Sequence, residues 1–219
     1  MAFSYPVTLN LTNRSCTVVG GGIVALRKVK SLLEEGAKVK VISPELCEEL
    51  AVLHQGYQNE QNDNFVWINE PVRDDLLCGS FLVIAATDNR AVNHQVAMWC
   101  EANQVLVNVV DSREESSFTV NAAVKRGDLL IAISTDGASP AVSRSIRMQL
   151  EAQFGEEYAV MLEIMEQARK EAMRTIPDEK KRREFLQRLA EMNLQDLLKI
   201  ETKEEVQKRV ELCLSSYWA

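Results

Sequence analysis

The chain has 219 residues, a length that allows one large domain or two modest ones. Hydrophobic residues make up 46% and charged residues 26% of it, values typical of a globular protein. Its net charge of −7 disfavours general binding to nucleic acid or to an anionic membrane, so we expect neither partner. The five cysteines form no CxxC pair and the start of the chain does not resemble a signal peptide, so we expect a cytoplasmic protein without a disulfide framework. No membrane span and no resident metal site are expected, because long apolar runs and metal-ligand spacings are missing from the sequence.

The first half of the chain alternates short apolar runs with helical patterns. Residues 16–19 form an apolar run that ends in three glycines, and apolar positions then recur at helical spacing over residues 23–35. Further strands are expected at residues 38–42, 65–68, 81–86 and 105–110, with a helix over residues 89–102. Apolar strands separated by helices predict an α/β fold of the Rossmann type, in which helices cover both faces of a parallel sheet.

The segment after the second strand predicts a helix followed by a loop. Ser43 resembles an N-cap residue and Pro44 fits the first helical position, so a helix is expected to run from there toward His54. Residues 54–64 are polar and lack periodicity, which predicts a surface loop.

The pattern changes after the fifth strand. Residues 118–124 and 129–133 flank a turn that contains Gly127, which predicts an antiparallel hairpin. Ser139 and Pro140 predict a helix start, and the rest of the chain resembles amphipathic helices with a break near Pro177 and a capping box at Thr202 and Glu205. We therefore expect a Rossmann domain over residues 1–112, a small α+β segment over 113–148 and a helical domain over 149–219.

The three glycines fit the pattern GxGxxA between a strand and a helix. Gly20 permits the tight turn, Gly22 lets the backbone approach a pyrophosphate, and Ala25 lets the helix pack close to the sheet. With Gly21, they would present free N–H groups and the positive end of the helix dipole to the phosphates. The strand, turn, helix and second strand together favour dinucleotide binding over the alternative, a tight turn that holds no ligand.

The position that usually reads the ribose is occupied by Ser43, with Glu45 two residues later. Glu48 and Glu49 make this area acidic and no arginine follows, so a ribose 2′-phosphate would be poorly received. The cofactor is therefore expected to be NAD. Lys40 is the nearby cation, and an ordinary strand-edge lysine is favoured over a phosphate contact.

Two further segments follow strand ends, where ligands bind in open α/β sheets. Thr87 and Asp88 follow the fourth strand, and Asn108 and Val109 end the fifth. All four are expected to border the cofactor cleft. Helix capping is the alternative for Thr87 and Asp88, and the two roles can coexist.

A set of motifs, in this order and spacing, closely resembles the sirohaem synthase family in its precorrin-2 dehydrogenase / sirohydrochlorin ferrochelatase module. The resemblance extends over about residues 3–150, and the helical tail is similar only in general character. The motifs are Val19-Gly-Gly-Gly-Ile-Val-Ala-Leu-Arg-Lys28, Ile84-Ala-Ala-Thr-Asp88, Asn108-Val-Val-Asp111, Ser117-Phe118 and Ser134-Thr-Asp-Gly-Ala-Ser-Pro140.

The resemblance implies NAD-dependent oxidation of precorrin-2 to sirohydrochlorin, on the way to sirohaem or a cobalamin. Some members also insert ferrous iron, so a transient ferrous or cobaltous ion is a further implied partner. It also implies a homodimer with its interface in residues 113–148. No methyltransferase domain follows, so this chain is not expected to make its own precorrin-2. The positions that contact NAD in the family fall on Ile23, Val24, Pro44 and Glu45.

The family's conserved aspartate falls on Asp111, and its serine before the Ser-Pro pair is replaced by Thr135. Asp111 stands at a strand's carboxyl end, where a carboxylate can accept substrate protons as a base; a turn or capping aspartate is the alternative. A tetrapyrrole carries many carboxylates, which Arg113, Arg144 and Arg147 could bind in forked geometry, although solvation is the simpler role for any single one.

A non-enzymatic NAD-binding sensor or regulatory module is the competing function, because such proteins share the glycine turn. They usually carry the acidic ribose residue that Ser43 replaces here, and a DNA-binding regulator would need a basic segment that the sequence lacks. His54 and His94, the two histidines, could aid proton transfer or metal delivery, but packing or capping roles are favoured.

Overall fold

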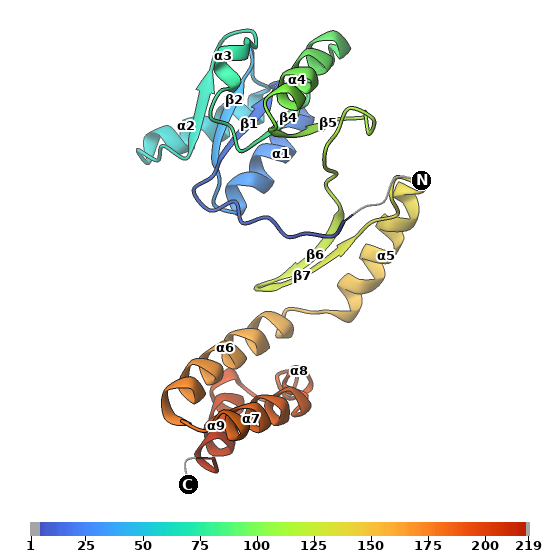
Figure 1. Cartoon of the computed structure of the whole chain (residues 1–219). Coiled ribbons are helices and arrows are strands. Elements are labelled where there is room, and N and C mark those ends of the chain that lie inside the picture. The colour runs from blue at the N-terminus through green and yellow to red at the C-terminus, as the bar shows by residue number, and fades with distance from the viewer. Residues whose placement is uncertain (1–4, 218–219) are drawn as a thin grey trace. The chain divides into compact units, whose positions relative to one another are not determined.

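The computed structural model describes residues 5–217. The expectation that the chain does not start with a leader peptide falls partly on residues 1–4, which lie outside the described residues. The chain forms two compact units, Met1–Val120 and Asn121–Ala219, and each is described by itself (Figure 1). No helix in the described part of the chain is long and apolar enough to cross a membrane.

The first unit is built on a five-stranded parallel sheet in the order β3-β2-β1-β4-β5. The chain starts in the middle of the sheet, proceeds to one edge, and then crosses back to the other side of β1. This reversal creates a switch point between β1 and β4, where the carboxyl ends of open α/β sheets form ligand sites. The strands are β1 (Ser15–Val19), β2 (Lys38–Ile42), β3 (Phe65–Ile68), β4 (Leu82–Ala85) and β5 (Leu106–Val109).

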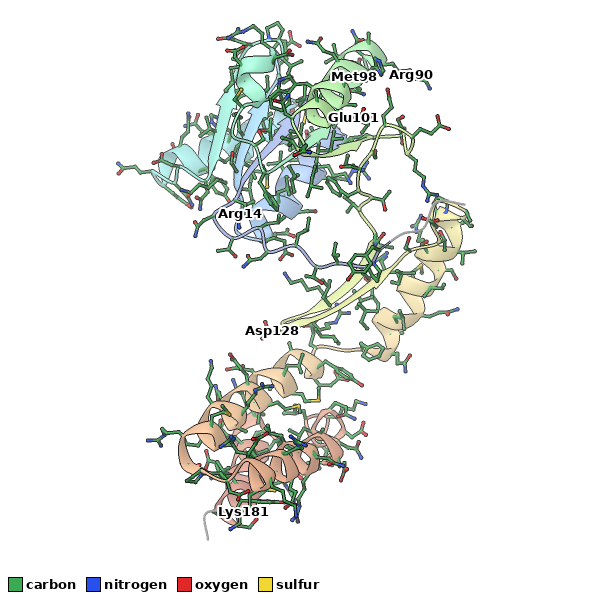
Figure 2. The ribbon with its side chains drawn as sticks, in the orientation of Figure 1. Arg14, Arg90, Met98, Glu101, Asp128 and Lys181 are labelled. Carbon is green, nitrogen blue, oxygen red and sulfur yellow. The ribbon has the colours of Figure 1, made fainter. Side chains whose placement is uncertain are left out.

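Helices cover both faces of this sheet, which confirms the predicted fold class (Figure 1). Alternate strand residues face opposite sides, so Val18 packs into one core with α1 (Ile23–Glu34) and α2 (Glu48–Asn59). Val83 packs into the other core with α3 (Asp74–Leu77) and α4 (Arg90–Ala102). Helix α4 shows the amphipathic pattern: Arg90, Met98 and Glu101 are exposed on its surface (Figure 2), whereas Cys100 is fully buried.

The predicted helix start at Ser43 and Pro44 is wrong. Helix α2 begins at Glu48 with Cys47 as its N-cap, because the Ser43 hydroxyl donates a hydrogen bond to the Glu45 carbonyl instead of accepting one from a helical amide. The predicted loop over 54–64 is also wrong up to Asn59, where α2 ends.

The helical pattern of α2 is weak because it buries a narrow stripe. Leu50 is fully buried, and Leu53 and Tyr57 pack beside it at spacings of three and four residues. Packing on the sheet therefore holds a helix whose local sequence is polar.

The second unit begins with the antiparallel hairpin of β6 (Ala122–Arg126) and β7 (Leu129–Ile133), in which Val124 pairs with Ile131. The hairpin turn contains Gly127 and Asp128, and Asp128 marks it in Figure 2. The first strand starts at Ala122 and not at 118 as expected, because residues 117–118 hydrogen-bond to β5.

Helix α5 (Pro140–Gln153) starts where the sequence predicts, and the Ser139 hydroxyl accepts a hydrogen bond from the Val142 amide at 3.3 Å. The remaining helices share one core that includes Ile164, Phe185 and Leu189. The predicted break at Pro177 and the capping box of Thr202 and Glu205 are both present. These helices are α6 (Glu157–Thr175), α7 (Glu179–Glu191), α8 (Leu194–Leu197) and α9 (Lys203–Ser215).

Candidate cofactor site at the glycine turn

The first two glycines are required by close backbone contacts. Gly20 has a φ of +120°, and a Cβ atom there would lie 2.4 Å from the Ala86 carbonyl oxygen at the end of β4. A Cβ atom on Gly21 would lie 1.9 Å from the Glu45 carbonyl oxygen. Both distances are far inside van der Waals contact, so only glycine lets the turn pack between β4 and the loop after β2.

Gly22 is different, because a Cβ atom there would meet nothing within 4 Å. It is the N-cap of α1, with ordinary extended backbone and no side chain to cap the helix. The first helical hydrogen bond recorded at this end runs from the Leu26 amide to the Gly22 carbonyl at 3.0 Å, so the preceding amides remain available. The turn thus presents amides and a positive dipole end to open space, the arrangement that binds phosphate. Ile23, which is 53% exposed, and the half-buried Val24 occupy the first helical positions beside it.

The loop over residues 43–47 lies directly against this turn. The Cys47 amide donates to the Gly21 carbonyl at 2.7 Å, and the Ser43 hydroxyl donates to the Glu45 carbonyl at 2.7 Å. The side chains of Pro44 and Glu45 are exposed. The acidic loop expected at the ribose is therefore beside the glycine turn, although its backbone is not helical.

Lys40 does not take part in this site. Its ammonium group donates to the Leu76 carbonyl at the end of α3, and burial lowers the pKa of Lys40. The sequence favoured a strand-edge lysine without a phosphate contact; the structure supports a structural role, but β2 lies between β1 and β3 and is not an edge strand.

The segment after β4 is held by an internal hydrogen-bond network. Asn89, and neither Thr87 nor Asp88, is the N-cap of α4, since its side-chain oxygen accepts from the amides of residues 91 and 92. The Thr87 hydroxyl donates to the side-chain oxygen of the buried Asn93 at 2.7 Å. The capping interpretation of Thr87 and Asp88 is therefore wrong. The Asp88 carboxylate is exposed and has no hydrogen-bond or ion-pair partner among residues 5–217.

Asp111 follows β5 in the left-handed backbone region, with a φ of +62°, and its side chain is exposed. Aspartate and asparagine tolerate this conformation better than most residues. The two site residues before it are engaged elsewhere: Asn108 donates to the Phe118 carbonyl at 3.1 Å, and the amide of the buried Val109 donates to the Ser116 hydroxyl at 2.9 Å. Their contact with a cofactor stays a prediction.

Two serines hold the segment that carries Asp111 along the edge of β5. Ser116 bonds both the amide and the carbonyl of Val109, and Ser117 does the same for Val107. These hydroxyls satisfy the free edge of the sheet. The His94 ring contacts Glu115 in the same segment, and this hydrogen bond, with a second from Ser112, lowers the pKa of Glu115.

The candidate substrate residues Thr135, Arg144 and Arg147 belong to the second unit. The Thr135 hydroxyl donates to the Ser139 carbonyl at 3.1 Å and lies 2.9 Å from the Ser143 hydroxyl, so it stabilises the start of α5. Arg147 pairs with Glu151 one turn later on α5.

The guanidinium of Arg144 is exposed, and no partner for it occurs in the part of the chain that the structure describes. Arg113, in the first unit, is also exposed.

Neither histidine forms part of a metal cluster. Within residues 5–217, no group of three or more His, Cys, Asp or Glu side chains has the arrangement of a metal site. His54 packs edge-on against Phe65 and Trp67, and burial lowers its pKa.

Sequence reasoning missed Trp67, Asn93 and Ser116, whose roles depend on partners that local patterns do not reveal.

The fold and the glycine turn together define a Rossmann-type dinucleotide-binding protein. A family model described as putative NAD(P)-binding matches residues 7–122, and a model for the central part of sirohaem biosynthesis proteins matches residues 126–153. The chain belongs to the sirohaem synthase family. The predicted resemblance is thereby confirmed.

Individual relatives extend the match into the C-terminal helices. The chain is 34% identical to the siroheme synthase of Mannheimia succiniciproducens over 211 residues and 37% identical to that of Photorhabdus laumondii over 180 residues. These alignments cover 96% and 82% of this chain but 43% and 37% of the relatives, so the chain spans about two fifths of the curated relatives it matches. A solved structure of SirC, a precorrin-2 dehydrogenase, matches with a TM-score of 0.76 and 28% identity, over 95% of this chain and 100% of SirC.

Proposed function

We propose that this protein is an NAD-dependent dehydrogenase that oxidises precorrin-2 to sirohydrochlorin in sirohaem or cobalamin biosynthesis. The observation that carries the proposal is the open, uncapped N-terminus of α1 at Gly22, which lies at the switch point of the parallel sheet. The chain that forms this sheet belongs to the sirohaem synthase family. The likeness to SirC over that protein's whole length supports the same activity for a chain of this extent.

The described residues fit NAD. The amides from Gly21 to Val24 would bind the pyrophosphate, and Pro44 and Glu45 would face the adenosine ribose. A carboxylate beside the ribose accepts hydrogen bonds from its hydroxyl groups and repels a 2′-phosphate, which favours NAD over NADP. When bound, the nicotinamide supplies the hydride acceptor.

Asp111 is proposed as the base. Oxidation of the macrocycle removes a hydride, which goes to the nicotinamide, and also protons, which need an acceptor. The exposed carboxylate of Asp111 follows β5 at the carboxyl edge of the sheet. The contacts of Ser116 and Ser117 with β5 hold the segment after this strand in place, so the backbone at Asp111 has a fixed position from which its carboxylate can act as a base.

Residues that could bind the substrate carboxylates are Arg113, Thr135, Arg144 and Arg147. Arg144 offers an exposed guanidinium for forked binding, and Arg147 could exchange its Glu151 partner for a substrate carboxylate. Thr135 would act through its hydroxyl and through the start of α5 that it stabilises.

We also propose a homodimer whose interface lies in residues 113–148. Exposed apolar side chains in this segment support an interface: Leu130 is 47%, Val142 48% and Met148 57% exposed. The free thiols, including the exposed Cys78, favour a reducing compartment such as the cytoplasm. A transient ferrous or cobaltous ion would be a second substrate of a chelatase reaction, which is tested separately.

One assay tests the proposal directly. Purified protein mixed with precorrin-2 and NAD should produce sirohydrochlorin absorbance together with NADH. Tight NAD binding without turnover of active precorrin-2 would instead identify a non-enzymatic NAD-binding sensor. Sirohydrochlorin mixed with ferrous or cobaltous ion, with and without protein, measures chelation against the spontaneous rate.

A further inference from the structure

We propose that Trp67 is a positioning residue for NAD, and that its indole N–H holds the loop over residues 43–47 in the conformation that receives the ribose. The inference rests on the proposed NAD site and deepens it, because it identifies what sets the shape and the selectivity of that site.

Trp67 lies on β3, the edge strand beside β2, where it pairs in register with Val41. Its indole Nε1 donates a hydrogen bond of 2.9 Å to the carbonyl oxygen of Ser43, the first residue after β2. The Ser43 amide donates to the Ile68 carbonyl at 3.2 Å. Both backbone polar groups of Ser43 are therefore attached to β3, so the start of the loop is determined by the edge strand.

The attachment continues from Ser43 to the glycine turn. The buried Ser43 donates its hydroxyl to the Glu45 carbonyl at 2.7 Å, and that carbonyl lies where a Cβ atom on Gly21 would come within 1.9 Å. The Cys47 amide closes the loop on the Gly21 carbonyl at 2.7 Å. A shift of Ser43 would consequently move the Glu45 backbone relative to the amides that bind the pyrophosphate.

The indole itself is held in place by aromatic packing. The His54 ring meets Trp67 nearly perpendicularly, with 5.9 Å between the centroids, and meets Phe65 in the same way at 5.0 Å. Edge-to-face pairs of this kind fix ring orientation. The N–H group is thus aimed at Ser43 by neighbours on α2 and β3.

This arrangement has a consequence for cofactor choice. The loop contains Glu45, is followed by Glu48 and Glu49 at the start of α2, and has no arginine. Held against the glycine turn, a carboxylate at position 45 favours a free ribose 2′-hydroxyl and repels a 2′-phosphate. If the loop sampled other conformations, only part of the protein would be in the conformation that binds NAD, and the apparent affinity for NAD would fall by that fraction. The protein would then discriminate less between NAD and NADP.

The test uses the full-length chain with Trp67→Phe, which keeps an aromatic ring on β3 and removes only the N–H donor. Trp99→Phe is the matched control, because Trp99 lies on α4 and packs into the opposite core. Calorimetric titration should show the NAD Kd raised roughly three- to tenfold in Trp67→Phe, the size expected for one lost hydrogen bond. The NADP Kd should change less, so that the ratio of the two narrows, whereas Trp99→Phe should match the parent.

Steady-state kinetics provide a second readout. With Trp67→Phe, KM for NAD should rise while kcat at saturating NAD stays within about twofold, because the loop is proposed to contact the adenosine ribose, at the opposite end of NAD from the nicotinamide. An unchanged NAD Kd and an unchanged NAD-to-NADP ratio in Trp67→Phe would overturn the inference and leave the proposed function intact. A parent protein that binds no NAD would overturn both. If Trp67→Phe does not fold, Ser43→Ala removes the next hydrogen bond in the series and must give the same narrowed ratio.

Discussion

Gly22→Asp should severely weaken NAD binding while making the ligand-free protein more stable. Gly22 has a φ of −85° and a ψ of −174°, values that any residue adopts, and a Cβ atom there would meet nothing within 4 Å. Aspartate is a favoured N-cap residue, and its carboxylate would accept hydrogen bonds from the uncapped amides of α1. Three effects stabilise the ligand-free variant: the better cap, the interaction with the helix dipole, and the smaller entropy of the unfolded chain. Together they should raise the free energy of unfolding by about 1 kcal/mol, which corresponds to roughly 2–4 °C in Tm.

The same carboxylate would oppose the cofactor. Repulsion between two unit charges about 4 Å apart is about 1 kcal/mol in water and about 4 kcal/mol near a protein surface. NAD carries a diphosphate, and the aspartate would also occupy the amides that should bind it. We therefore expect the NAD Kd to rise at least about 100-fold, which corresponds to about 2.7 kcal/mol.

Gly22→Asn separates charge from shape, because asparagine caps a helix equally well without a charge. Thermal unfolding without ligand should give similar Tm values for both variants, above that of the parent. Calorimetry should show a weaker loss of affinity for the asparagine variant, and added salt should restore part of the affinity of the aspartate variant only. NAD binding by Gly22→Asp within threefold of the parent would refute the assignment of the pyrophosphate to this turn.

Three further predictions concern other parts of the chain. Asp111→Asn removes the proposed base but keeps a residue that tolerates the left-handed backbone, so turnover should fall about 100-fold or more while NAD affinity stays near normal. Asp111→Ala should show the same fall in turnover and should also lower the free energy of unfolding by about 1 kcal/mol. Normal turnover in either would exclude Asp111 as the base. Burial raises the pKa of Cys16 and Cys100 to about 11, so at pH 8 both should resist alkylation until the protein unfolds, while the exposed Cys78 reacts, as peptide mass spectrometry would show. Phe185→Ala should destabilise the C-terminal helices by about 3–5 kcal/mol and leave NAD binding by the first unit intact, because Phe185 is fully buried in a separate core. Calorimetry that shows an equal loss of helix stability and of NAD affinity would contradict this.

The glycine turn shows how much of the site the sequence could predict. The strand, the three glycines and the helix are neighbours in the chain, and the pattern of small residues reports directly on backbone geometry. The structure adds that each glycine has a separate cause: Gly20 and Gly21 are confined by backbone, while Gly22 faces open space. Sequence reasoning could assign roles to the pattern but could not distinguish contact with the protein from contact with a ligand.

The loop after β2 shows where sequence reasoning failed. Ser43 and Pro44 are as suitable for a helix start as Ser139 and Pro140, yet only the second pair begins a helix. The difference lies outside the local sequence, because the Ser43 carbonyl and amide are held by β3 and its hydroxyl is used by Glu45. Tertiary partners thus override the local preference.

The sequence by itself determined the fold class, because apolar runs and helical patterns alternate along the first half of the chain. It also determined the glycine turn and the caps at Ser139 and Thr202, because each of these depends on residues within about one helical turn of each other. Only the tertiary structure decided the conformation of the ribose loop and the attachment of the Asp111 segment to β5. Those features depend on hydrogen bonds such as Trp67 to Ser43, between residues that are far apart in the chain and become neighbours only when the sheet has formed.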